Sequence, residues 1–176
     1  RSRGLGDVYK RQDIGKGTTF RIKLKFRVTS DDNNDEHNQA MKIEAYKKLN
    51  YNGKKILLVE DDEFNAEVMK ELLTEVGIDV EIAPNGRNGI SRLKEREAGY
   101  YSIVFMDIRM PGIDGYETTR QIRRNQRDDL KKIPIIAMTA EAFSNDVKMA
   151  VDAGMNGHIA KPVDLDCLKA VLDDWL

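Results

Sequence analysis

Short apolar runs mark the chain beyond residue 50. They read "KKILLVE" at 54–60, "YSIVFMD" at 101–107 and "IPIIAMT" at 133–139. Runs of this length without polar alternation are typical of strands in a parallel sheet whose two faces are covered by helices. The pattern therefore indicates an α/β domain rather than an all-helical or all-β one.

Between these runs, apolar residues recur at helical spacing. Phe64, Val68, Leu72 and Val76 fall four positions apart, and Gly77 stands where a helix would end. Similar spacing predicts further helices with inward-facing Ile90, Leu93, Thr118, Gln121, Ile122, Val147, Met149, Ala150, Val151, Leu165, Leu168, Val171, Leu172 and Leu176. We predict that residues 53–176 form a doubly wound α/β domain in which five parallel strands alternate with five helices.

Nearer the start, in "DIGKGTTFRIKLKF" at 13–26, apolar residues recur at every second position. Phe20, Ile22, Leu24 and Phe26 alternate with basic residues, which predicts one half-buried strand, either isolated or one arm of a hairpin. The glycines do not form a phosphate-binding loop, because the Gly-Lys pair is not followed directly by Ser or Thr.

The flanking segments contribute little apolar surface. Residues 2–12 resemble a translated sequencing adapter, so we treat 1–12 as a non-native tail and expect the natural protein to extend further N-terminally. Residues 27–52, with "TSDDNNDEHNQ", read as a linker that carries a short helix at about 40–49.

The net charge and the hydrophobic content of the chain limit the kinds of molecule that it is expected to bind. The 176 residues have a net charge of −1 and are 40% hydrophobic, with no apolar run long enough to cross a bilayer. We expect no nucleic-acid partner, no membrane contact by this segment and a cytoplasmic location. The single cysteine, Cys167, cannot form an internal disulfide, and we assign it to packing.

Polar residues stand at the carboxyl ends of the predicted strands, where open α/β sheets place their sites. Glu60 and Asp61 follow the first strand, Asp107 ends the third, Thr139 ends the fourth, and Lys161 follows the fifth in "GHIAKP". Clustered carboxylates repel one another unless a cation lies among them, and hard oxygen ligands suit Mg²⁺. A carboxylate in this setting can attack a phosphoryl group, whereas the neighbouring Asp62 is assigned to helix capping.

Four motifs occur in order: "ILLVEDDEFN", "FMDIRMPGIDG", "IIAMTA" and "GHIAKP". Together they resemble the response-regulator receiver domain, a flavodoxin-like fold, over residues 54–176. The resemblance implies that Asp107 is the phosphoacceptor and Asp61 a direct Mg²⁺ ligand. It also implies that Glu60 holds the metal through water, that the Arg109 backbone carbonyl completes the ligands, and that Lys161 pairs with the phosphoryl group.

The same resemblance assigns a conformational switch to Thr139 and His158. The Thr139 hydroxyl would bond the phosphoryl group, and the side chain at 158 would turn inward. Histidine replaces the commoner tyrosine or phenylalanine there, which leaves an ordinary exposed histidine as an equal alternative. The bond from Lys161 to Pro162 is expected to be cis.

Residues 13–26, with "GKGTTF", resemble the last glycine box and closing strand of a histidine-kinase ATP-binding domain. A receiver after such a remnant resembles a hybrid histidine kinase, although the 176 residues hold no kinase core. Its implied partners are a kinase domain in the same polypeptide and a histidine phosphotransfer domain. We expect a helical partner to dock at Phe64 and Met69.

Three alternatives belong to other classes of protein. A haloacid-dehalogenase-like phosphatase would need an aspartate two residues after its nucleophile, where this chain has Arg109. A pure interaction module would usually lack the acceptor or the lysine, and both are present. A stand-alone single-domain regulator differs from a hybrid kinase only in its upstream sequence.

Overall fold

The computed structural model describes residues 8–13, 17–22, 41–140 and 144–176. The chain forms two compact units, Arg1–Asn38 and Gln39–Leu176, which are described separately.

In the first unit, β1 (Val8–Asp13) pairs antiparallel with β2 (Gly17–Ile22). The predicted strand is therefore one arm of a hairpin rather than isolated, and it pairs with residues that the adapter resemblance had excluded from the fold. A hairpin satisfies backbone groups that a lone strand would leave unpaired. Residues 23–26 of the predicted strand lie outside the described residues.

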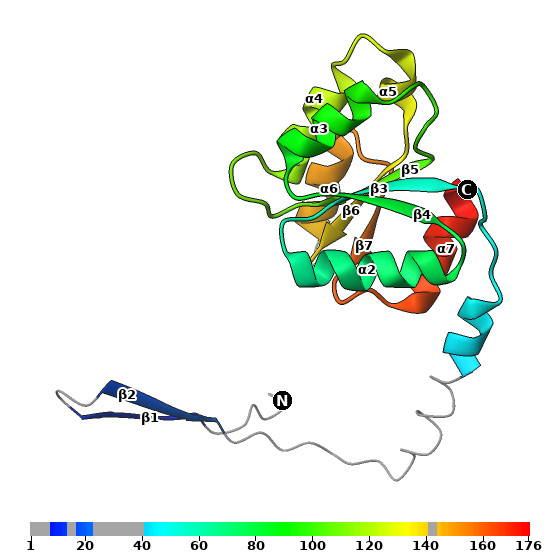
Figure 1. The fold of residues 1–176 in the computed structure, drawn as a ribbon. Coiled ribbons are helices and arrows are strands. Elements are labelled where there is room, and N and C mark those ends of the chain that lie inside the picture. Colours follow the sequence, from blue (N-terminus) through cyan, green and yellow to red (C-terminus); the bar gives the residue numbers. More distant parts are fainter. Residues whose placement is uncertain (1–7, 14–16, 23–40, 141–143) are drawn as a thin grey trace. The chain divides into compact units, whose positions relative to one another are not determined.

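The second unit is built on a five-stranded parallel sheet in the order β4-β3-β5-β6-β7 (Figure 1). Its strands are β3 (Lys55–Val59), β4 (Asp79–Ala83), β5 (Ile103–Asp107), β6 (Ile135–Thr139) and β7 (Gly157–Ala160). Every residue of β5 and β6 is buried, as the continuous apolar runs predicted. The predicted parallel α/β fold is confirmed. β3 pairs with β4 on one side and with β5 on the other. The strand order therefore reverses at β3, and a topological switch point lies between β3 and β5.

Helices cover both faces of this sheet (Figure 1). One face carries α2 (Glu63–Glu75) and α7 (Leu165–Trp175), and the other carries α3 (Gly86–Glu95), α4 (Gly115–Arg123), α5 (Asp128–Lys132) and α6 (Ser144–Ala153). The prediction of five helices missed α5. With five residues, α5 is too short to show a helical period.

The apolar stripe predicted for α2 is only partly correct. Phe64 and Val68 are 76% and 43% exposed, whereas Ala66, Met69 and Leu73 are buried. A spacing of four exceeds the 3.6-residue turn, so such a stripe drifts around the helix by about 40° per step. Residues at the far end of the predicted stripe therefore leave the buried face.

Two further burial predictions are wrong. On α6, Ala150 is buried, but Met149 and Val151 are exposed because adjacent positions cannot share one helix face. Cys167 on α7 is exposed rather than packed in the core. Gly77 does end α2 as predicted, with the positive φ of 86° that favours glycine.

The sheet unit begins before residue 53, where we had placed its start. Residues 41–47 form the helix predicted at about 40–49, and Tyr46 is only 3% exposed in the core beside α2 and α7. The segment that composition had assigned to a linker is thus partly folded onto the domain. No helix in the described parts of the chain is long and apolar enough to cross a membrane.

Candidate active site

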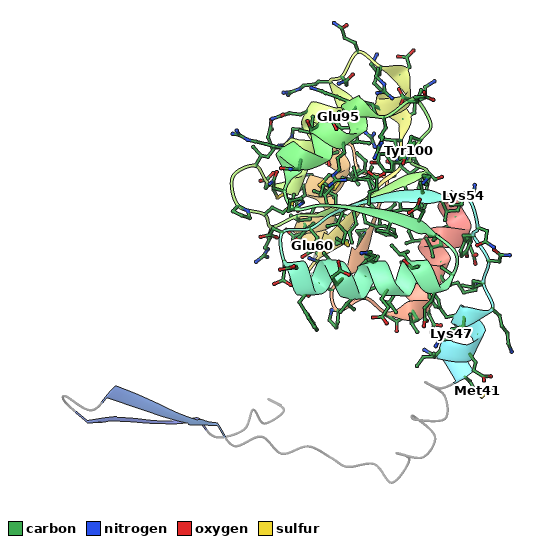
Figure 2. The ribbon with its side chains drawn as sticks, in the orientation of Figure 1. Met41, Lys47, Lys54, Glu60, Glu95 and Tyr100 are labelled. Atoms are coloured by element: carbon green, nitrogen blue, oxygen red, sulfur yellow. The ribbon has the colours of Figure 1, made fainter. Side chains whose placement is uncertain are left out.

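The carboxyl ends of four strands carry the predicted site residues. Glu60 (Figure 2) directly follows β3, and its backbone N–H donates to the Ala83 carbonyl at 3.1 Å. Asp107 and Thr139 are the last residues of β5 and β6, and Lys161 directly follows β7. Because the strands are parallel, these residues meet at one edge of the sheet beside the switch point.

Three carboxylates form a close cluster at this edge. Glu60, Asp61 and Asp107 each offer an oxygen within 4.8 Å of the others. Glu60 and Asp107 are 3% and 7% exposed, whereas Asp61 faces solvent. Such a cluster favours a hard cation, because oxygen donors of like charge repel one another in a poorly solvated site. The donor set therefore fits Mg²⁺.

Lys161 supplies the positive charge of the cluster. Its Nζ lies 2.6 Å from Glu60 Oε2 and 3.1 Å from Asp107 Oδ2. Burial raises the pKa of Glu60, the hydrogen bond from Lys161 opposes that rise, and the negative charge of Asp107 adds to it. The sequence had paired Lys161 only with a phosphoryl group, so its ion pair with Glu60 is new.

Asn65 is a site residue that sequence reasoning missed. Its side-chain amide donates to Glu60 Oε1 at 3.4 Å, and its backbone N–H donates to the Asp62 carboxylate at 2.8 Å. Asp62 is thus the N-cap of α2, as predicted. Asn65 could have been noticed from its position two residues after the acidic run at 60–63.

The loop after β5 is held close to Asp107. The backbone N–H of Arg109 donates to Asp107 Oδ1 at 3.3 Å, and the Arg109 side chain is exposed. Gly115 donates its N–H to the Ile108 carbonyl at 3.0 Å. A Cβ on Gly115 would lie 2.2 Å from the Asp107 carbonyl oxygen, so only glycine fits where α4 meets β5.

The two predicted switch residues differ in their surroundings. Thr139 is buried at the end of β6, and its carbonyl accepts from the Lys161 backbone N–H at 2.8 Å. The peptide bond between Lys161 and Pro162 is cis, as predicted. His158 lies on β7 with an exposed side chain.

A cavity of about 440 Å³ opens beside the carboxylates, between α2 and the segment after β7. We call it the partner groove; its lining includes Glu60, Phe64, Asn65, Val68, Met69, Leu72, Met138, Lys161, Pro162 and Val163. Phe64 offers an exposed apolar contact, as predicted for a docking site. Met69 is almost fully buried but also lines the groove, so its predicted contact with a partner stays a prediction.

Known proteins share this arrangement. Residues 56–173 match the family of response regulator receiver domains. This chain belongs to that family. It is 38% identical over 124 residues to the osmosensing histidine protein kinase SLN1 of Saccharomyces cerevisiae, and 36% identical over 123 residues to hybrid signal transduction histidine kinase A of Dictyostelium discoideum. Each match covers 69% of this chain, but only 10% and 6% of those kinases.

Solved receiver structures agree with the fold. The receiver domain of sensor histidine kinase PA1611 of Pseudomonas aeruginosa, which has a magnesium ion in its active-site cleft, is 37% identical. It superimposes with a TM-score of 0.62 over 70% of this chain and 97% of its own. The predicted receiver domain, of the kind found in hybrid histidine kinases, is confirmed. The assignments of 13–26 to a kinase remnant and of 2–12 to an adapter stay predictions.

Proposed function

We propose that this receiver takes a phosphoryl group from a phosphohistidine onto Asp107 and passes it to a histidine phosphotransfer domain. The observation that carries the proposal is the 3.1 Å approach of Lys161 Nζ to Asp107 Oδ2 within the carboxylate cluster. The Asp107 oxygen forms the new bond to phosphorus as the bond from phosphorus to the imidazole nitrogen breaks. The departing electron pair stays on the histidine ring.

The cluster would hold Mg²⁺ through the carboxylates of Asp61 and Asp107, the backbone carbonyl of Arg109, and Glu60 acting through water. When bound, this ion would supply positive charge against the phosphoryl oxygens. Lys161, directly after β7, would pair with the same oxygens. It can do so because its ion pairs with Glu60 and Asp107 already hold the ammonium at the acceptor.

Thr139 and His158 complete the proposal. The Thr139 hydroxyl, at the end of the neighbouring strand, would donate to a phosphoryl oxygen on Asp107. His158, exposed on β7, fits the outward position from which a switch residue would turn inward. The signalling step would therefore alter the surface of β7.

The partner groove supports docking of a helical phosphotransfer domain. Phe64 and Val68 are exposed on α2 directly beside Glu60 and Lys161. A partner helix packed against them would bring its histidine to the acceptor carboxylate. The donor would be a kinase domain, in our proposal part of the same cytoplasmic polypeptide. A stand-alone regulator remains the alternative, and the upstream reading frame separates the two.

A phosphatase of the haloacid-dehalogenase type is not supported. Its general acid would stand where this chain has Arg109, whose side chain is exposed and positively charged. The proposed receiver chemistry is tested by incubating the chain with acetyl phosphate and Mg²⁺ and counting phosphoryl groups by intact mass. Asp107→Asn is the variant that must lose the label.

A further inference from the structure

The residues that precede β3 are folded against α2, which lines the partner groove, and against α7, which follows the groove residues Pro162 and Val163. We name residues 41–54 the clasp; it contains the helix at 41–47 and ends at Lys54 (Figure 2). Tyr46 inserts its ring into the apolar core shared by α2 and α7, and burial raises the pKa of its hydroxyl. Leu49 and Tyr51 pack against the same core.

One set of contacts joins the clasp to the last turns of α2. The hydroxyl of Tyr46 donates to the Leu72 carbonyl at 3.1 Å, and the backbone N–H of Tyr51 donates to the Val76 carbonyl at 2.8 Å. These bonds use carbonyls at the C-terminal end of a helix, which would otherwise need water or another cap. An ion pair at 3.1 Å adds to them, between Lys47 and Glu75.

A second set joins the clasp to α7. The hydroxyl of Tyr51 donates to Asp173 at 2.5 Å, and Lys54 Nζ donates to the Leu176 carbonyl at 2.8 Å. Lys42 pairs with Asp166 in the first turn of the same helix, at 2.5 Å. The clasp thus contacts α7 at both of its ends and α2 at its C-terminal end.

The clasp and the partner groove share structural parts. Leu72, whose carbonyl binds Tyr46, also lines the groove. The opposite wall is formed by Pro162 and Val163, the residues that lead into α7. Close-packed interiors transmit small displacements, so a shift of α2 relative to α7 would change the distance between the groove walls.

We infer that the clasp fixes the spacing of α2 and α7 and thereby sets the partner groove for a helical phosphotransfer domain. This inference rests on the proposed function for its partner. The clasp lies on the chain just before the receiver sheet, so it also links whatever precedes residue 41 to the docking surface. Tyr46 is a positioning residue in this account, because it touches neither the partner nor the reacting atoms.

The test compares two buried tyrosines in the full chain. Tyr46→Ala and Tyr46→Phe alter the clasp, whereas Tyr101→Ala and Tyr101→Phe alter a tyrosine of similar burial in the other core cluster. The probe is a purified four-helix histidine phosphotransfer domain, titrated against each variant by calorimetry. Methyl NMR of Val68, Leu72 and Val163 reports on the groove without a partner.

Tyr46→Ala is expected to raise the Kd for the phosphotransfer domain about tenfold and to shift the three groove methyl signals. Tyr46→Phe loses only the hydrogen bond to the Leu72 carbonyl. It should raise the Kd and shift the methyl signals in the same direction as Tyr46→Ala, but by a smaller amount. The Tyr101 variants should leave the Kd and those signals as in the unsubstituted chain. Labelling of Asp107 by acetyl phosphate and Mg²⁺ should change less than about twofold in every folded variant.

Unchanged Kd and methyl signals in the Tyr46 variants would overturn the inference, and so would equal changes in the Tyr101 variants. If Tyr46→Ala does not fold, the same readouts on Tyr46→Phe decide. Failure of the unsubstituted chain to accept phosphate from acetyl phosphate would instead reject the proposed function. Methyl shifts confined to the Tyr46 variants would then still support the clasp.

Discussion

Lys161 reaches Asp107 across an intervening strand. The Nζ of Lys161 lies 3.1 Å from Asp107 Oδ2, although β6 separates β5 from β7 in the sheet. A long, flexible side chain with a point charge suits this span. The pair joins the proposed acceptor to the only lysine that the structure describes within the carboxylate cluster.

Replacing that lysine tests its proposed role. Lys161→Gln removes the charge and keeps a polar side chain that is one atom shorter, so we expect labelling of Asp107 by acetyl phosphate to slow about a hundredfold. Lys131→Gln, which removes an exposed lysine paired with Asp128 on α5, is the control and should label normally. Time courses of intact mass measure both, and a normal rate in Lys161→Gln would exclude the lysine from the chemistry.

Magnesium should stabilise the fold through the carboxylate cluster. At a hundredfold excess over its Kd, a ligand that binds only the folded state adds about 2.7 kcal/mol to the free energy of unfolding. We expect the Tm to rise during a magnesium titration, and the rise to be lost in Asp61→Asn. A Tm of the unsubstituted chain that does not change with magnesium concentration would argue against the metal site.

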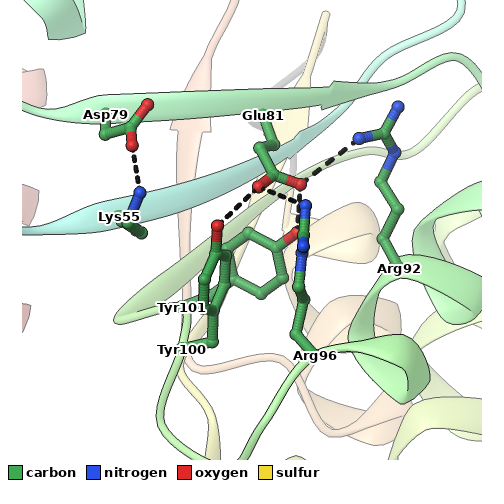
Figure 3. Close-up of polar contacts among 7 residues, drawn as sticks. All are labelled: Lys55, Asp79, Glu81, Arg92, Arg96, Tyr100 and Tyr101. Carbon is green, nitrogen blue, oxygen red and sulfur yellow. Dashed lines mark hydrogen bonds and ion pairs between the residues drawn. The ribbon is translucent and has the colours of Figure 1, made fainter.

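A separate network at the edge strand β4 predicts a pH effect on stability (Figure 3). The Glu81 side chain is only 20% exposed, and it accepts hydrogen bonds from Tyr101 at 2.6 Å and from Tyr100 and Arg96 at 2.9 Å. Burial favours the neutral acid, but these donors outweigh it and lower the pKa of Glu81 to about 2.

Since the folded-state pKa of Glu81 lies below its ordinary 4.5, its contribution to stability is present above pH 4.5 and disappears as the pH falls toward 2. Glu81→Gln should therefore lower the free energy of unfolding by about 1–3 kcal/mol at pH 7. Urea unfolding at pH 7 and near pH 2 measures the difference, which should shrink in acid. A constant difference between these pH values would show that the charge of Glu81 is not involved.

Gly115 should be intolerant of a side chain. Its Cβ would clash with the Asp107 carbonyl oxygen, so Gly115→Ala must displace α4 or the acceptor loop. We expect a loss of about 1–3 kcal/mol in the free energy of unfolding, together with slower labelling of Asp107. Denaturant unfolding and labelling of the same sample measure both. An alanine variant equal to the unsubstituted chain in both assays would contradict the close approach.

Much of the site was predictable from sequence because four of its residues stand at or directly after the end of a strand. Asp107 and Thr139 close continuous apolar runs, and parallel strands bring such ends together without any knowledge of side-chain contacts. The ion pair between Lys161 and Glu60 was not predictable, since it joins residues 101 positions apart through side-chain conformation.

The helix of the clasp was predicted, but its packing onto the domain escaped prediction for a related reason. The polar residues before Met41 indicate a linker, and the seven-residue helix at 41–47 is too short to be stable by itself in water. It is held by Tyr46 and by carbonyls at the end of α2, partners that lie far along the chain. Phe64 and Val68 were misplaced because a four-residue spacing alone does not reveal which side of a helix faces the sheet.

The central claim is tested most directly by the site of phosphorylation. After incubation with acetyl phosphate and Mg²⁺, mass spectrometry should find one acid-stable, base-labile phosphoryl group, located at Asp107 and absent from Asp107→Asn. Full labelling of Asp107→Asn, or a label at another residue of the unsubstituted chain, would contradict the account.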